Sequence, residues 1–145
     1  MNALVIDASI AVKWVVDEDG TPEALALRKR GKLLAPELLV SECANILWKK
    51  VRLNELTRDE ALIAARLLQA SDIELLPTRS LLAAAVQIAI GLDHPAYDCV
   101  YIALAIAHDC PFVSADQRLL RKLGEARGNP VRKRVISLTV AAQGN

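Results

Sequence analysis

The sequence predicts a single α/β domain in which helices cover both faces of a mostly parallel sheet. Short apolar runs typical of strands alternate along the chain with longer segments of helical patterning, and this alternation favours a parallel sheet. The chain has 145 residues, of which 53% are hydrophobic, enough for one well-filled core. We therefore expect one domain over residues 1–145.

The predicted elements follow one another in a regular order. Strands are expected at residues 3–7, 33–35, 73–76, 112–114 and 135–138. Helices are expected at residues 8–16, 21–30, 36–53, 57–70, 80–90, 96–108 and 117–123. Thr21-Pro22 is a preferred helix start, as is the capping box of Thr57 and Glu60. Pro36 is expected to open the long third helix, and three glycines to end helices: Gly31, Gly91 and Gly124.

The charge of the chain is nearly balanced overall but unevenly distributed. The formal net charge is +1. Residues 1–116 hold 11 Lys and Arg against 16 Asp and Glu, whereas residues 117–145 hold 7 against 1. A basic end beside an acidic body suggests a polyanionic partner. Aromatic residues make up only 3% of the chain, so platforms for stacking bases are scarce.

Cysteine usage and the beginning of the chain indicate a cytoplasmic protein. The chain has three cysteines, Cys43, Cys99 and Cys110, and none belongs to a CxxC pair, so neither a disulfide framework nor a zinc cluster is expected. The first residues lack the features of a signal peptide. No apolar run approaches the ~20 residues that a membrane span requires.

Four acidic residues stand where an apolar core alone would not require them. Asp7 and Asp116 each follow a buried apolar run, and Glu42 and Asp98 interrupt helices rich in Leu, Ala, Ile and Val. The carboxyl ends of parallel strands face the crevice in which such folds bind ligands. Carboxylates gathered there repel one another unless a cation lies between them. Hard oxygen ligands favour Mg²⁺ or Mn²⁺, ions that activate water and polarise a phosphodiester.

Taken alone, three of these acids also have a purely structural interpretation. Asp7, with Ser9 two residues further on, could cap the helix that follows it, and so could Asp116 after Ser114. Asp98 lies in the first turn of a helix, where the helix dipole favours a carboxylate. Their joint placement at strand ends or early in helices favours a common site over capping alone.

Glu42 and the two histidines have their own alternatives. Glu42 shares a helix face with Asn45 and Lys49, and such a stripe is often a solvated outer face. The stripe is narrow and the helix is otherwise apolar, which favours an inward position for Glu42. His94 and His108 are isolated in the sequence, so we expect both to be ordinary surface or packing residues.

Four motifs carry a resemblance that covers residues 3 to about 138. They are VIDAS at residues 5–9, SECANIL at 41–47, YDCVYIALA at 97–105 and VSADQRLL at 113–120. In this order and spacing they resemble the PIN-domain ribonucleases, and among these the VapC toxins of toxin–antitoxin pairs. The resemblance implies a three-layer α/β/α fold with a parallel five-stranded sheet in the order 3-2-1-4-5. It also implies an Mg²⁺- or Mn²⁺-dependent endoribonuclease that forms a homodimer and is silenced by a VapB-like antitoxin.

The resemblance also implies a role for individual residues. Asp7 and Asp98 are expected to bind the metal directly, and Glu42 and Asp116 to complete its shell partly through water, so that all four are catalytic. Supporting roles are expected for Ser9, Asn45 and Ser114; the last stands where the family often has Thr. We expect the RNA backbone to lie along six basic residues, which offset the repulsion between acids and phosphates: Arg118, Arg121, Lys122, Arg132, Lys133 and Arg134.

Partners are expected on an apolar surface formed by Leu25, Leu38, Leu39, Ile46 and Trp48. Exposed patches of this kind usually mark an interface, and we expect a homodimer with a second groove for an antitoxin peptide.

Three alternative functions stay open at the level of sequence. The first is a housekeeping PIN nuclease of RNA processing without an antitoxin. The second is a receiver-type phospho-acceptor domain, which needs an acidic pair after its first strand, where this chain has Asp7 alone. The third is a non-catalytic binding module, which would not need all four acids. A Gly-rich phosphate loop is absent from the sequence, so hydrolysis of nucleoside triphosphates is not indicated.

Overall fold

A five-stranded sheet forms the centre of the computed structural model, which describes residues 3–144. All strand pairs are parallel, and the strand order is β3-β2-β1-β4-β5. The strands are β1 (Ala3–Ile6), β2 (Lys32–Pro36), β3 (Glu74–Leu76), β4 (Phe112–Ser114) and β5 (Val135–Ser137). The predicted α/β class and the strand order 3-2-1-4-5 are thereby confirmed.

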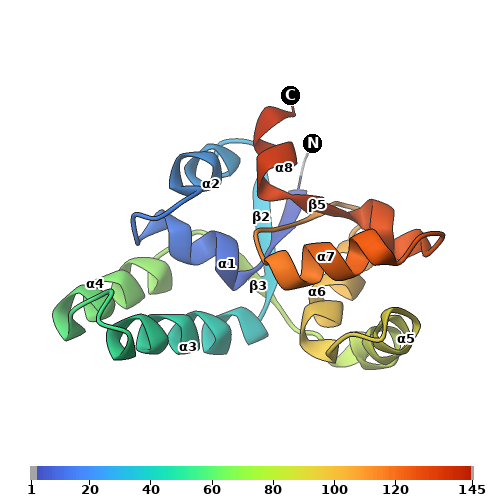
Figure 1. Ribbon diagram of the computed structural model, residues 1–145, viewed down its shortest axis with the longest axis horizontal. Coiled ribbons are helices and arrows are strands. Elements are labelled where there is room, and N and C mark those ends of the chain that lie inside the picture. Colours follow the sequence, from blue (N-terminus) through green and yellow to red (C-terminus); the bar gives the residue numbers. More distant parts are fainter. Residues whose placement is uncertain (1–2, 145) are drawn as a thin grey trace.

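Helices lie on both sides of this sheet. The α-helices within residues 3–144 are α1 (Ala8–Ala11), α2 (Thr21–Leu27), α3 (Leu38–Arg52), α4 (Arg58–Gln69), α5 (Leu82–Leu92), α6 (Ala96–Ala107), α7 (Gln117–Glu125) and α8 (Leu138–Gln143). Short 3₁₀ turns are η1 (Val12–Trp14), η2 (Arg79–Leu81) and η3 (Pro130–Arg134). In Figure 1, α1 to α4 lie on one side of the strands and α5, α6 and α7 on the other. The three-layer arrangement is therefore confirmed.

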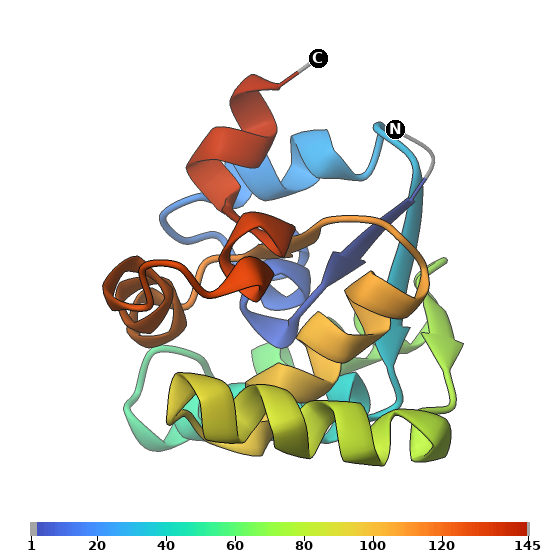
Figure 2. The same ribbon diagram turned by 90° about the vertical axis from the view of Figure 1, so that its right-hand side faces the viewer.

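The core is built around β1, β4 and α6. Residues 4–6 and 112–114 are buried, as expected of central parallel strands. Helix α6 is apolar on nearly every side and is buried from Tyr101 to Ala105, because it lies between the sheet and α5 (Figure 2). The ring of Tyr101 stacks on that of Phe112 with centroids 5.4 Å apart. This rigid centre carries the ends of the elements that hold the acids.

The expected roles of Pro36 and of the three glycines were wrong. Pro36 ends β2 and does not open α3. Helix α2 ends at Leu27, before Gly31, and α7 continues through Gly124. Helix α5 continues through Gly91, and Asp93 takes the left-handed conformation with φ 52°. A short acidic side chain tolerates this conformation better than most residues, so glycine is not required there.

Two further boundaries differ from the predictions. The first helix divides into α1 and η1 and ends at Trp14. Leu138, expected in the last strand, begins α8, which was not predicted; Ser137 caps this helix by accepting a hydrogen bond from the Val140 N–H at 3.2 Å. The capping box of Thr57 and Glu60 is confirmed in both of its hydrogen bonds. Within residues 3–144, no helix combines the length and the apolar character needed to cross a membrane.

Candidate active site

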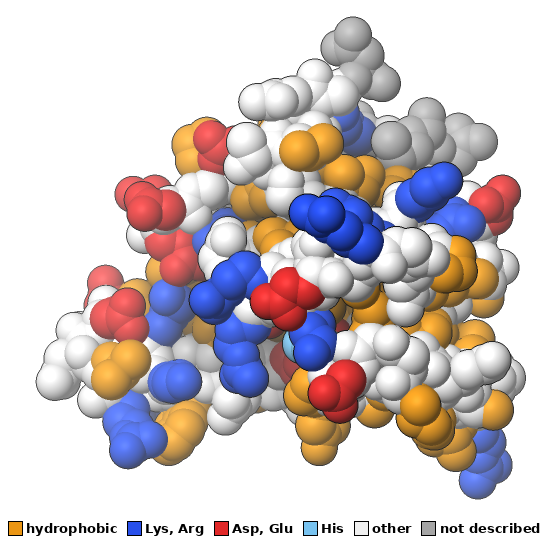
Figure 3. Space-filling view, turned by 45° about the vertical axis from the view of Figure 1, so that its right-hand side comes forward, with side chains coloured by type: hydrophobic (Ala, Val, Ile, Leu, Met, Phe, Trp, Pro, Cys, Tyr) orange, Lys and Arg blue, Asp and Glu red, His pale blue; other side chains and the backbone are white. Residues whose placement is uncertain are grey.

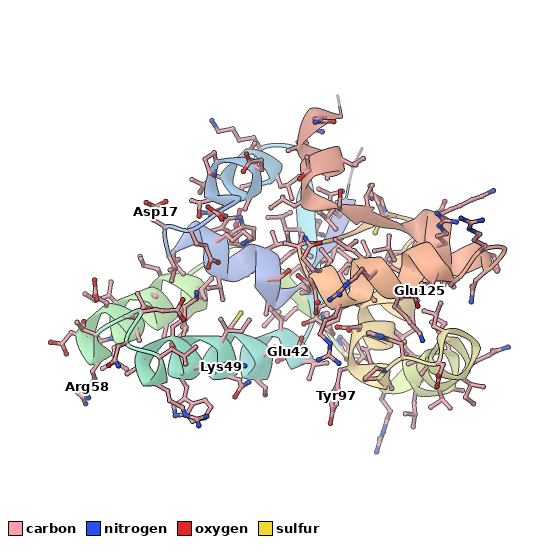
Figure 4. All side chains as sticks on the ribbon, in the orientation of Figure 1. Asp17, Glu42, Lys49, Arg58, Tyr97 and Glu125 are labelled. Atoms are coloured by element: carbon pink, nitrogen blue, oxygen red, sulfur yellow. The ribbon has the colours of Figure 1, made fainter. Side chains whose placement is uncertain are left out.

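The four acids predicted from the sequence lie around one pocket at the carboxyl edge of the sheet. The pocket has a volume of about 320 Å³ and is lined by Asp7, Ala8, Ser9, Leu38, Ser41, Glu42, Asn45, Ile46, Tyr97, Asp98 and Asp116. Asp7 follows β1 and Asp116 follows β4. The strand order reverses at β1, because β2 and β3 lie on one side of it and β4 and β5 on the other. In Figure 4, Glu42 on α3 and Tyr97 on α6 lie where these two helices come together.

Asp7 is held by two serine hydroxyls. The residue is 5% exposed, and its Oδ1 and Oδ2 accept hydrogen bonds of 2.5 Å from Ser9 Oγ and Ser114 Oγ, respectively. Burial raises the pKa of Asp7 to about 7; the two serines oppose this rise, and the charges of Asp98 and Asp116 add to it. The side chain caps no N–H of α1, so the capping interpretation is wrong for Asp7.

The same serines connect the loops that follow β1 and β4. The Ala115 N–H donates to Ser9 Oγ at 3.0 Å, and the Asp116 N–H donates to Ser114 Oγ at 3.0 Å. Each hydroxyl thus accepts from the second loop while it donates to Asp7. These contacts support the predicted supporting role of Ser9 and Ser114.

Glu42 is half-buried and lines the acidic pocket. The Tyr101 hydroxyl donates a hydrogen bond to Glu42 Oε1. Burial raises the pKa of Glu42, the Tyr101 hydrogen bond opposes this, and the nearby charges of Asp98 and Asp116 add to it. Of the three polar residues that share one face of α3, Glu42 and Asn45 line the pocket and Lys49 does not.

Asp98 is paired with His94, a residue that the sequence did not single out. The His94 Nε2 atom lies 2.6 Å from Asp98 Oδ2, and the two side chains are 8% and 20% exposed. His94 is therefore not a surface residue, and it has a polar partner that the sequence did not predict. Tyr101 was missed as well. The signals that could have found them are the closeness of His94 to Asp98 along the chain and the hydroxyl of Tyr101 within the aliphatic part of its helix.

Asp116 does cap a helix, as its structural interpretation predicted. Its Oδ1 accepts hydrogen bonds from the backbone N–H groups of Arg118 at 2.9 Å and Leu119 at 3.4 Å. Its Oδ2 accepts no hydrogen bond from any residue in the range 3–144. One oxygen thus fixes the orientation of the carboxylate, and the other is available to the pocket.

The donor set fits a hydrated Mg²⁺ or Mn²⁺ ion. In the described part of the chain, no three His, Cys, Asp or Glu side chains form a group close enough to ligate one ion together. Mg²⁺ suits such a spread site because it keeps several waters and takes only one or two protein carboxylates. Cys43, one residue after Glu42, does not line this pocket, so its thiol, a ligand type that softer metals prefer, does not belong to the donor set.

The structure separates the six basic residues into two groups. Arg118, Arg121 and Lys122 of α7 line a second cleft of about 320 Å³, together with Asp93, His94, Pro95 and Glu125. This basic cleft adjoins the acidic pocket, because Asp116 caps α7 and His94 contacts Asp98. Figure 3 shows Lys and Arg side chains beside acidic ones, with a histidine between them, near the centre of one face.

The second group lies on η3, at the amino ends of the strands, opposite the end that carries the acidic pocket. Arg134 Nη1 contacts Asp109 Oδ1 at 3.2 Å and the Cys110 carbonyl at 3.3 Å. Asp109 and Cys110 precede β4, whereas Asp7 and Asp116 of the acidic pocket follow β1 and β4. The structure therefore does not bring Arg132, Lys133 and Arg134 of η3 (Pro130–Arg134) to the acidic pocket.

Comparison with known proteins identifies the family. Residues 4–125 match the PIN domain family, so the chain belongs to that family, whose members are in general nucleases. The receiver-type interpretation is therefore wrong. The fold is similar to the crystal structure of PAE2754 from Pyrobaculum aerophilum, with a TM-score of 0.69 and 20% identity over 97% of this chain and 87% of that chain. No curated protein matches the chain by sequence.

Proposed function

We propose that the chain is an Mg²⁺- or Mn²⁺-dependent endoribonuclease that hydrolyses RNA phosphodiester bonds. The observation that carries this proposal is the pocket lined by Asp7, Glu42, Asp98 and Asp116. Phosphates avoid such an acidic pocket unless a divalent cation is bound there. The adjoining basic cleft supplies the charges that offset this repulsion on the side of the substrate.

Each acid has a distinct task in this proposal. Asp7 and Asp98 would hold the cation directly, and Glu42 and Asp116 would do so through water. When bound, the cation supplies an activated water and stabilises the departing oxygen. The serine, tyrosine and backbone donors described above fix the carboxylates of Asp7, Glu42 and Asp116 before RNA binds. The expected products carry 5′-phosphate ends.

The RNA is held beside the acids by the basic cleft. Within residues 3–144, Arg118, Arg121 and Lys122 make no ion pair, so their charges are available to phosphates. Tyr97 lines the acidic pocket and is 67% exposed. Its ring offers a face on which an unpaired base stacks.

The direct test is incubation of the purified protein with total RNA in Mg²⁺, in Mn²⁺ and in EDTA, followed by mapping of the cut ends. Cleavage with either metal, loss in EDTA and 5′-phosphate ends are expected. Asp98→Asn should be inactive, whereas Asp109→Asn, a matched change at a side chain that is 94% exposed, should cleave as the wild type does. Undiminished cleavage in EDTA contradicts the proposal.

We further propose that this nuclease is the cytoplasmic toxin of a toxin–antitoxin pair. Its motifs resemble those of VapC toxins, and an apolar groove of about 370 Å³ between α3 and α4 offers a place for a VapB-like antitoxin segment. This groove is lined by Leu39, Val40, Cys43, Ala44, Leu47, Ala65, Leu68, Gln69, Ser71, Ile73 and Leu75. An antitoxin arginine suits the acidic pocket because a guanidinium is always charged and binds carboxylates bidentately.

The apolar surface expected to support partners is only partly as predicted. Leu39 is buried in the core, whereas Leu25 and Trp48 are exposed, as are Val40 on α3 and Leu67 on α4. We propose that this surface also supports a homodimer.

Co-expression with the product of a small adjacent reading frame tests the toxin proposal. A complex in which cleavage is inhibited supports it. A nuclease that no neighbouring product binds or inhibits favours the housekeeping alternative.

A further inference from the structure

We propose that His94 is a positioning residue that holds Asp98 in the orientation required for the divalent cation; this inference rests on the proposed function. His94 is nine-tenths buried, and its Nε2 lies 2.6 Å from Asp98 Oδ2. An ionised carboxylate can only accept hydrogen bonds. His94 is therefore the donor, from Nε2, and Oδ1 of Asp98 is left for the cation.

The backbone on both sides of His94 fixes the position of its ring. The His94 N–H donates to the Ala89 carbonyl at 3.2 Å and thereby closes the end of α5. Asp93 before it is left-handed, with φ 52°, and Pro95 after it precedes the first turn of α6. Because Asp98 lies in that first turn, the imidazole and the carboxylate meet across four residues.

The other acids of the pocket have comparable donors. Asp7 accepts from two serines, and Glu42 accepts from Tyr101. Carboxylates that bind metals are commonly hydrogen-bonded in this way, and loss of such a donor typically weakens metal affinity or activity by about 10- to 100-fold. For Asp98, His94 is the side chain that makes this bond.

The alternative is that His94 only fills space between α5 and α6. The two interpretations differ in what can replace the ring. If the ring only fills space, the position of a hydrogen-bond donor has no effect on the metal. If His94 positions Asp98, a donor must stand where Nε2 stands. Glutamine places its amide nitrogen near the position of Nε2, whereas asparagine is one methylene shorter and does not reach Asp98.

The experiment compares His94→Gln with His94→Asn in the full chain. Thermal unfolding in EDTA first establishes that each variant is folded. Binding of Mn²⁺ alone is then measured by titration calorimetry, and cleavage is measured against Mg²⁺ concentration. His94→Leu serves as a second variant without a donor. His108→Asn, at the exposed histidine that ends α6, is the matched control.

We expect His94→Asn and His94→Leu to bind Mn²⁺ about 10- to 100-fold more weakly than the wild type. For His94→Gln the affinity should stay within about threefold, and His108→Asn should not change it, because neither change removes a donor to Asp98. Wild-type affinity in a folded His94→Asn or His94→Leu variant overturns the inference, as does an equal loss in His94→Gln. Failure of the wild type to bind Mn²⁺ and to cleave RNA overturns the proposed function as well.

Discussion

Asp7 is almost fully buried at the edge of the acidic pocket, and this burial determines how the stability of the metal-free protein depends on pH. Burial raises its pKa from 3.8 to about 7. The folded state thus binds this proton more tightly than the unfolded state. In the absence of metal, the protonated Asp7 carboxyl makes its full contribution to the free energy of unfolding below the unfolded pKa. This contribution is lost as the pH rises through about 7.

The first prediction is that Asp7→Asn stabilises the metal-free protein at about pH 8 by on the order of 2–4 kcal/mol. The amide stays neutral at every pH and can still exchange hydrogen bonds with Ser9 and Ser114. Near pH 4, where the wild-type carboxyl is also neutral, the two proteins should differ little. Urea unfolding in EDTA at both pH values measures the effect.

The same substitution should abolish cleavage, because the amide lacks the charge that holds the cation. Asp109→Asn, at an exposed side chain, controls for the loss of any acid. Cleavage by Asp7→Asn within a few-fold of the wild type would show that Asp7 is not a metal ligand.

The second prediction concerns the Tyr101 hydroxyl. Tyr101→Phe keeps the stack on Phe112 and loses the hydrogen bond that lowers the pKa of Glu42. The pKa of Glu42 should rise further, so that Glu42 is ionised over a narrower range of pH. Cleavage measured at two pH values should fall more at the lower one, while stability falls by about 1 kcal/mol. An equal loss at both pH values would contradict this explanation.

At the scale of elements, α7 and η3 both present basic residues but at opposite edges of the sheet. Helix α7 begins at the acidic pocket, because Asp116 is its cap. The turn η3 precedes β5, and its Arg134 contacts Asp109 before β4. Only the first of the two elements can hold RNA that also reaches the acids.

The third prediction compares two triple substitutions to alanine, one at Arg118, Arg121 and Lys122, the other at Arg132, Lys133 and Arg134. Each lost phosphate contact removes roughly one unit from the slope of log affinity against log salt. The α7 variant should lose about two to three units, and the η3 variant less than about one. RNA binding over a range of salt concentrations, in EDTA, measures both slopes. A larger loss in the η3 variant would move the RNA path to the other edge of the sheet.

At the scale of the whole molecule, the exposed apolar side chains of α3 and α4 are the surface on which partners are expected. Val40 on α3 lines the apolar groove and is 54% exposed. Val140 on α8 is equally exposed at 54% and does not line that groove. The two valines therefore form a matched pair.

The fourth prediction is that Val40→Glu disrupts assembly and Val140→Glu does not. A charge buried in an apolar interface is costly unless it is paired, whereas both sites tolerate a charge in the isolated chain. Light scattering should give twice the 15.8 kDa chain mass for the wild type and Val140→Glu, and a lower mass for Val40→Glu. Inhibition by a co-expressed antitoxin should weaken in parallel. A monomeric wild type would contradict the proposed homodimer.

Local sequence predicted all five strands and the beginnings of most helices, but it did not predict α8. The alternation of apolar runs and helical segments predicted a parallel sheet, and the capping box at Thr57 marked the start of α4 correctly. Such signals act over three or four residues, so they can be read directly from the chain. The helix ends predicted at Gly31, Gly91 and Gly124 were wrong. Helix α2 ends before Gly31, and α5 and α7 continue through Gly91 and Gly124.

The sequence by itself also determined which acids gather, because the carboxyl ends of parallel strands must share one edge of the sheet. Only the tertiary structure decided what each acid contacts. Ser114 reaches Asp7 across 107 residues, and Tyr101 reaches Glu42 across 59. Contacts at such separations depend on how helices and strands pack against one another, and no periodicity within a segment records that packing. For the same reason, the basic end of the chain divided between two edges of the sheet, although in sequence it is one cluster.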